Sequence, residues 1–170
     1  AASSQYLSGF GLGSPPEGAP IGSTYPLNRW MEVWARPTLN SGVRQEVVSD
    51  TFQFGLFTTA GGTWGQTYGS AAAPANLGDD FDTGAPVAFN QWTHIMQRTF
   101  GNGGVAVYIN GVAVGRFDGG YTASTIAVTP TPDRNMYVGA GSGGGANFFT
   151  GQLDSLKIGV YGDNTAQGGQ

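Results

Sequence analysis

The densest group of acidic side chains in the sequence is Asp79, Asp80 and Asp82. They lie in a stretch rich in Ala, Pro, Gly and Asp, from Gly69 to Gly84, which we expect to be a long loop. Ca²⁺ binds carboxylate and backbone carbonyl oxygens, so these three residues are the candidate metal ligands. The ion would be optional, since no cofactor is required by any other feature of the chain. The alternative is a solvated acidic loop that holds no metal.

Acid–base catalysis has little support in this chain. A retaining glycosidase needs two carboxyl groups about 5 to 5.5 Å apart, but Glu17, Glu32 and Glu46 are widely spaced and are the only glutamates. Glu46 and Asp50 share one face of a strand by their four-residue spacing, but no third acidic residue completes a catalytic pattern. His94 is the only histidine, so a Ser-His-Asp arrangement would depend on it entirely. We expect no enzymatic activity.

A sugar-binding surface finds more candidates. Sugar C–H faces pack on aromatic rings and sugar hydroxyls form hydrogen bonds, so a platform needs exposed rings beside amides or carboxylates. Three aromatic residues lie in Gly-rich segments that we expect to be loops, and amide and carboxylate side chains lie in similar segments. The candidate ligand-binding residues are Trp64, Tyr68, Tyr121 and Asn147, with Asn76, Asp80 and Asp82 as further polar groups. By contrast, Trp30, Trp34 and Trp92 lie in predicted strands and are expected to pack in the core or between strands.

Composition excludes several classes of partner. The formal net charge is −4 and the seven basic residues are scattered, so there is no basic patch to bind a phosphate backbone. No apolar run reaches the roughly 18 residues that span a bilayer, and no positively charged, apolar leader is present. Cysteine is absent, which excludes disulfides and thiolate metal sites. We expect neither a nucleic-acid partner nor membrane insertion.

Short β-strands are the elements that would position the candidate residues. Thirty of the 170 residues are Gly, spread between apolar stretches, which is typical of tight turns between short strands. Only 11% of the residues are charged, so the surface is made largely of uncharged polar residues and Gly. Asn110-Gly111 lies between two alternating apolar runs and predicts a two-residue hairpin of the I′ kind. No helix or internal repeat is indicated. Strands are predicted over residues 30–37, 46–59 (a pair, or one bent strand), 92–100, 105–114, 135–141 and 151–160.

About ten such strands predict an all-β fold of two antiparallel sheets packed face to face. We expect a single domain over residues 1–161 and a polar tail over residues 162–170. Both polar ends, residues 1–20 and the tail, are long enough to reach a neighbouring subunit, so a homo-oligomer is compatible with the sequence.

Several segments resemble the laminin-G-like, concanavalin A-like family. NQWTHI at residues 90–95, followed by VYINGV at residues 107–112, is similar to that family's W-x-H-V and L-Y-V-D/N-G hairpin. RWMEVWARP at residues 29–37 resembles its early strand, F-T-V-E-A-W-V-x-P, with Glu32 and Trp34 at matching places. FTGQLDSLKI at residues 149–158 resembles its closing F-x-G-x-I-D-E-V-R-I, and Ser4 to Leu7 its opening strand. The resemblance implies a concanavalin A-like jelly roll, in which many relatives hold Ca²⁺ in loops at the sheet edge.

Two functions remain open, because this fold hosts lectins, adhesion modules, hydrolases and virion proteins. The first is a lectin-like or adhesion module that binds a glycan or polysaccharide. The second is a structural, decoration or fibre protein of a virus particle or an extracellular assembly, whose partners would be protein subunits. Either function places the chain outside the cell or on a virion surface.

Overall fold

The computed structural model describes residues 7–10, 29–50, 54–69, 78–99, 105–117, 136–141 and 145–160. Within these ranges the chain forms eleven strands and no helix, so none of the described residues belongs to a helix that could span a membrane. The strands are β1 (Leu7–Phe10), β2 (Arg29–Pro37), β3 (Gln45–Asp50), β4 (Phe54–Thr58), β5 (Thr63–Gly69), β6 (Gly78–Pro86), β7 (Thr93–Thr99), β8 (Val105–Ile109), β9 (Val112–Phe117), β10 (Met136–Val138) and β11 (Gly151–Val160).

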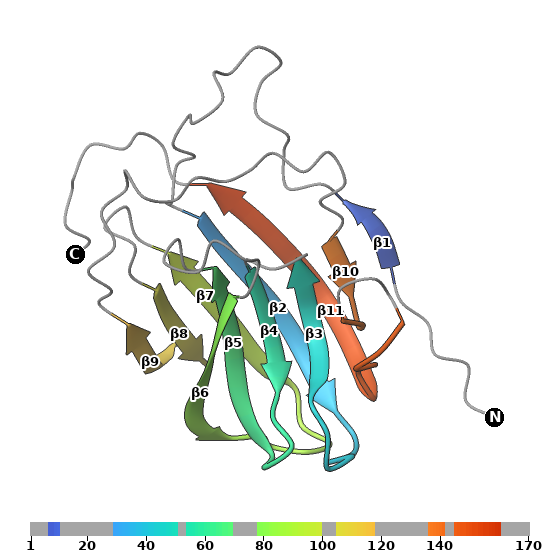
Figure 1. Ribbon diagram of the computed structural model, residues 1–170. Coiled ribbons are helices and arrows are strands. Elements are labelled where there is room, and N and C mark those ends of the chain that lie inside the picture. The colour runs from blue at the N-terminus through green and yellow to red at the C-terminus, as the bar shows by residue number, and fades with distance from the viewer. Residues whose placement is uncertain are drawn as a thin grey trace.

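The strands form two antiparallel sheets, one in front of the other in Figure 1. The six-stranded sheet has the order β1-β10-β3-β4-β5-β6, and the five-stranded sheet has the order β11-β2-β7-β8-β9. All strands paired in these sheets run antiparallel. This arrangement confirms the expected all-β sandwich of the concanavalin A-like type.

Alternation along the strands builds the core between the sheets. In β2, Met31, Val33 and Ala35 are fully buried, while the residues between them point to the outer face. Together with eight other buried apolar residues they form the hydrophobic core. The core lies between the two sheets because each sheet has one apolar face that must be covered. The eight others are Val47, Val48, Leu56, Trp64, Val87, Ile95, Val107 and Met136.

Two buried amides join the sheets across this core. Gln97 of β7 donates through Nε2 to Oε1 of Gln66 in β5 at 3.0 Å and to the carbonyl oxygen of Thr67 at 3.2 Å. Both glutamines have no exposed surface, so the bond fixes the relative position of the two layers in a low-dielectric interior.

The predicted hairpin and most predicted strands are confirmed. Asn110 and Gly111 both have positive φ, 50° and 80°, as a type I′ turn requires. Residues 46–59 contain two strands, β3 and β4, which pair with each other. Of the expected opening strand, Ser4 to Leu7, only Leu7 is described, and it begins β1; Ser4 to Tyr6 and the expected tail over residues 162–170 lie outside the described residues.

The predicted loop over residues 69–84 is wrong for its second half. Residues 78–86 form β6, the edge strand beside β5, whereas residues 70–77 lie outside the described part of the chain. Its composition suggested a loop because Asp and Gly are poor strand formers. The strand forms because Phe81 and Thr83 face inward, where they lie against Gly115 of β9, while Asp80 and Asp82 are exposed.

Candidate functional site

A single arginine holds together the most elaborate polar cluster on the outer face of the six-stranded sheet. Arg44, immediately before β3, donates through Nε to Glu46 Oε1 at 2.5 Å and through Nη2 to Thr67 Oγ1 at 2.8 Å. Its Nη1 forms a close ion pair with Oδ2 of Asp80. Thr67 in turn donates through Oγ1 to Oδ1 of Asp80 at 2.8 Å. The guanidinium therefore ties β3, β5 and β6 together on one surface.

An aromatic ring forms the floor beneath this guanidinium. The Cζ atom of Arg44 lies 3.6 Å from the centroid of the Phe57 ring, a cation–π contact. The Phe57 ring in turn lies flat on Gly65 of the neighbouring strand, where a Cβ would come within 2.3 Å of ring atoms. Gly65 is therefore needed for a close approach. We refer to Arg44, Glu46, Phe57, Thr67 and Asp80 as the Arg44 cluster.

Strand register explains why residues so far apart in sequence meet. Glu46 pairs with Phe57, and Phe57 pairs with Gly65, so these three form one row across the sheet. The next row runs through Ser49, Gly55, Thr67 and Asp80. The register shifts by one residue between Glu46 and Val48, a bulge that places Glu46 and Ser49 on the same outer face. The four-residue spacing of Glu46 and Asp50 therefore spans a bulge, and the side chain of Asp50 lies outside the description.

Glu46 is the electrostatic anomaly of the cluster. Its side chain is only 5% exposed, and its Oε2 atom has no hydrogen-bond partner. Burial raises the pKa of this carboxyl to about 7, against the lowering effect of the adjacent Arg44. A neutral Glu46 would still accept the Arg44 hydrogen bond through Oε1 and would carry its proton on Oε2. The cluster thus holds a buried carboxyl oxygen with no partner inside the described part of the protein.

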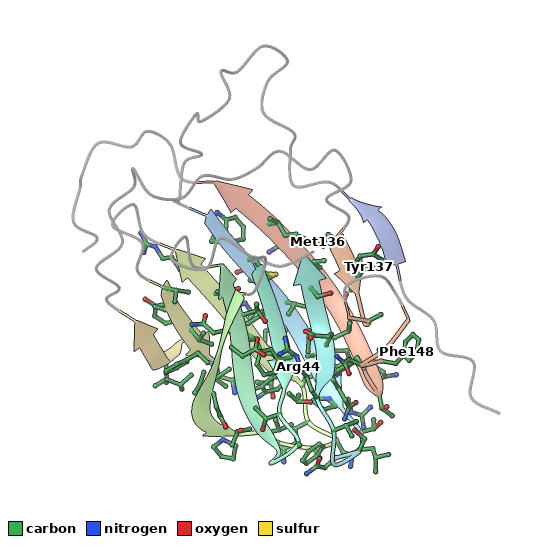
Figure 2. The ribbon with its side chains drawn as sticks, viewed as in Figure 1. Arg44, Met136, Tyr137 and Phe148 are labelled. Atoms are coloured by element: carbon green, nitrogen blue, oxygen red, sulfur yellow. The ribbon has the colours of Figure 1, made fainter. Side chains whose placement is uncertain are left out.

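The cluster continues toward β10 and the segment before β11. Figure 2 shows Arg44 near the middle of the six-stranded sheet, with Tyr137 on β10 and Phe148 in the segment before β11, both toward the right of the view. Tyr137 is opposite Ser49 in the register, so it continues the second row. The backbone N–H of Glu46 donates to the carbonyl oxygen of Asn147 at 2.8 Å, and this places Asn147 at the border of the cluster.

The structure joins two of the sequence-predicted site residues to this cluster. Asp80 belongs to it directly, and Asn147, which is exposed with a φ of 54°, lies beside it. Tyr121 and Asn76 lie outside the described residues. The backbone of Tyr68 belongs to β5, and its side chain is not among those the structure describes.

The expectation that Trp64 presents an open ring in a loop is wrong. Trp64 lies in β5 and is 1% exposed. Like Gln66, two residues further along β5, Trp64 points to the inner side of the strand, so its indole packs in the core. The glycines around it suggested a loop, but Gly65 is there because the Phe57 ring needs the space.

The strand tryptophans lie on the outer surface. Trp34 and Trp92 were expected to pack in the core or between strands; at 42% and 44% exposure neither is in the core, while Trp34 packs between strands against the His94 ring. Trp34 lies in β2, and Trp92 lies just before β7. Both faces of β2 carry large apolar residues, so alternation alone does not show which face is inside.

The predicted calcium ligands do not converge on one point among the described side chains. Asp80 is engaged by Arg44 and Thr67, and Asp82 accepts a hydrogen bond from the backbone N–H of Gly84 at 2.8 Å. Among the described residues no group of three potential His, Asp or Glu ligands is present. The side chain of Asp79 lies outside the description, so Ca²⁺ binding by Asp79, Asp80 and Asp82 stays a prediction.

Sequence reasoning missed Arg44, Phe57 and Thr67 as site residues. Opposite charges two residues apart, as in Arg44 and Glu46, mark one face of a strand and were an available signal. The partners from β4, β5 and β6 were not available, because strand pairing is non-local and the bulge in β3 leaves no mark in composition.

Comparison with known proteins agrees with this fold. The chain matches the family described as the concanavalin A-like lectin/glucanases superfamily (Laminin_G_3) over residues 31–160. It belongs to this superfamily. No curated protein sequence matches the chain.

Solved structures with the same fold include carbohydrate-binding domains. One is the Ruminococcus gnavus IT-sialidase CBM40 bound to alpha2,3 sialyllactose, 14% identical, with a TM-score of 0.63 and coverage of 81% of this chain and 79% of that one. Another is domain 4 of AbnA, an extracellular GH43 arabinanase from Geobacillus stearothermophilus, in complex with arabinotriose, 21% identical, TM-score 0.50, coverage 82% and 63%. A third is the heptameric SAP-like pentraxin of Limulus polyphemus, 17% identical, TM-score 0.52, coverage 78% and 63%. At these identities the likeness shows the fold alone.

Proposed function

We propose that this chain is a non-catalytic glycan-binding module whose ligand lies on the outer face of the six-stranded sheet, at the Arg44 cluster. The observation that carries the proposal is a buried carboxyl oxygen, Oε2 of Glu46, that has no hydrogen-bond partner among the described residues and lies beside the partly exposed guanidinium of Arg44. Buried polar atoms are nearly always paired, so an orphan beside a guanidinium suggests a missing ligand.

The chemistry of the cluster suits sugar hydroxyls. Arg44 uses three of its five N–H groups and its side chain is 28% exposed, so it has donors to spare. Asp80, 52% exposed, offers acceptor oxygens. Hydroxyls both donate and accept, as such a mixed set requires. The cluster pairs one guanidinium with two carboxyl groups, so it has no excess positive charge that would select an acidic sugar.

Asn147 and Tyr137 are the proposed contacts at the border of this site. The structures named above that hold sialyllactose or arabinotriose support glycan binding on this fold. The same comparison supports a secreted, extracellular location and a role as a binding domain rather than an enzyme. Among the matches described above nothing favours the other function expected from the sequence, a structural role in a virus particle or assembly.

The direct test is Arg44→Ala on a glycan array that contains neutral and acidic oligosaccharides, followed by calorimetry on the best ligand. We expect the affinity to fall at least tenfold, because the guanidinium organises all three strands of the site. Arg44→Lys should also bind weakly, since an ammonium cannot reproduce the fork that reaches three partners. Lys157→Ala, which removes a cation from the opposite sheet, should bind like the wild type. Equal affinity in Arg44→Ala, with the fold intact by circular dichroism, would disprove the site.

A further inference from the structure

The outer face of the five-stranded sheet carries a second surface, separate from the Arg44 cluster. Trp34 and Trp92 are 42% and 44% exposed, and both are among the few large apolar side chains that the described residues expose. Trp34 pairs with His94 across β2 and β7, and Trp92 precedes His94 by two residues. Thr93 between them is buried, so Trp92 and His94 lie on the same outer side. Trp92 lies one residue before β7, so the same alternation places it at the strand end, diagonal to Trp34 across β2 and β7.

Trp34 lies in β2, and Trp92 lies immediately before the start of β7. The centroids of the Trp34 and His94 rings are 5.2 Å apart, with the ring planes tilted by 49°. His94 therefore packs against Trp34, which remains 42% exposed. Arg36, two residues further along β2, donates through Nη1 to Gln152 Oε1 and through Nε to the carbonyl oxygen of Asn90, both at 3.1 Å. These bonds fix a polar border beside the rings. We refer to Trp34, Trp92, His94, Arg36 and Gln152 as the indole face.

The charges around the indole face cancel one another. Lys157 Nζ lies 2.9 Å from Oε1 of Glu32, and His94 Nε2 lies 3.3 Å from Oε2 of the same carboxylate. The hydrogen bond from Lys157 lowers the pKa of Glu32, so this carboxylate stays ionised and paired. Asp154, opposite Trp34 in the register, balances Arg36. Among the described side chains nearest the rings, the two cations Arg36 and Lys157 are therefore matched by the two carboxylates Glu32 and Asp154.

We infer that the indole face is a second carbohydrate site, specific for neutral oligosaccharides. Flat indole surfaces take the C–H faces of sugar rings, and the fixed guanidinium, amide and imidazole take hydroxyls, which is the combination that sugar recognition needs. A protein partner would favour a continuous apolar patch, whereas here polar groups separate and border the rings. The two sheets have opposite outer faces, so one molecule would hold two glycan strands at once. This inference goes beyond the proposed function, because the indole face shares no residue with the Arg44 cluster.

The test uses affinity electrophoresis of the whole chain in gels that contain soluble neutral polysaccharides: mixed-linkage β-glucan, xylan, arabinan or galactomannan. We expect the wild type to be retarded by at least one of them, and Trp34→Ala/Trp92→Ala to lose at least tenfold in affinity for it. Trp34→Phe/Trp92→Phe should keep most of the binding, since a ring remains at each position. Leu39→Ala, which removes another exposed apolar side chain, should bind this polysaccharide like the wild type.

A second measurement needs no variant. Acrylamide quenching of tryptophan fluorescence in the wild type should fall when the polysaccharide is added, because the sugar shields Trp34 and Trp92 while Trp64 is already buried. Unchanged quenching, or unchanged retardation of Trp34→Ala/Trp92→Ala, would overturn the indole face. If binding depends only on Arg44, this inference falls and the proposed function stands. If no glycan of either panel is bound, both fall.

Discussion

At the scale of single residues, Glu46 distinguishes this chain from a plain structural sandwich. A carboxyl that is almost fully buried, with one oxygen unpaired, costs stability unless it is neutral or meets a ligand. Its guanidinium partner offsets part of that cost, but burial dominates and raises the pKa to about 7. The residue therefore titrates close to neutral pH in the folded chain.

The pH dependence of stability follows from this shift. The folded chain holds the Glu46 proton up to about pH 7, while the unfolded chain releases it near the ordinary pKa of 4.5, so the unfolding free energy falls as pH rises between these values. The contribution is fully present below pH 4.5 and is lost through pH 7, and it amounts to roughly 3 kcal/mol. Glu46→Gln should remove it, which urea unfolding from pH 4 to pH 8 would measure.

The matched control for this experiment is Asp82→Asn. Asp82 is exposed on β6, and an asparagine keeps the oxygen that accepts the bond from Gly84. Its stability curve should follow that of the wild type. If the curve of Glu46→Gln also runs parallel to the wild type, Glu46 does not have a raised pKa.

At the scale of elements, the sequence predicted where strands occur better than which way they face. Asn110-Gly111 determined its hairpin locally, and the alternation in residues 30–37 determined β2. The side of β2 that is buried depends on the second sheet, so alternation alone did not show that Trp34 lies on the outer face. β6 was missed because its inward residues are only recognisable as such once Gly115 of β9 lies beneath Phe81. The Arg44 cluster needed four strands in register and a bulge, and none of these pairings is local.

Strand β5 offers a test of how closely the cluster is packed. Gly65→Ala would place a Cβ about where the Phe57 ring now lies, so the ring and the guanidinium above it must move. We expect a loss of about 1–3 kcal/mol in unfolding free energy and weaker glycan binding. Gly145→Ala is the control, because a Cβ there meets no atom within 4 Å, and it should change stability by less than about 0.5 kcal/mol. Equal effects of the two changes, measured by urea unfolding, would mean that Phe57 does not depend on Gly65.

At the scale of the whole molecule, the sandwich presents two broad faces that point away from each other (Figure 1). The sequence suggested that loops would provide recognition, with aromatic residues in Gly-rich segments as the platform. The described part of the chain gathers polar and aromatic groups on strands and strand ends of both outer faces, whereas Asn76 and Tyr121 from the expected loops lie outside it. A site on paired strands is already ordered before the ligand arrives, so binding loses less conformational entropy.

The most direct test of this account is an NMR titration of the ¹⁵N-labelled chain with the oligosaccharide that binds best on the array. We expect the largest amide shift changes on Arg44, Glu46, Thr67 and Asp80, in strands or strand ends on one face of the six-stranded sheet. Shift changes that leave these four amides untouched while the sugar binds elsewhere would contradict it.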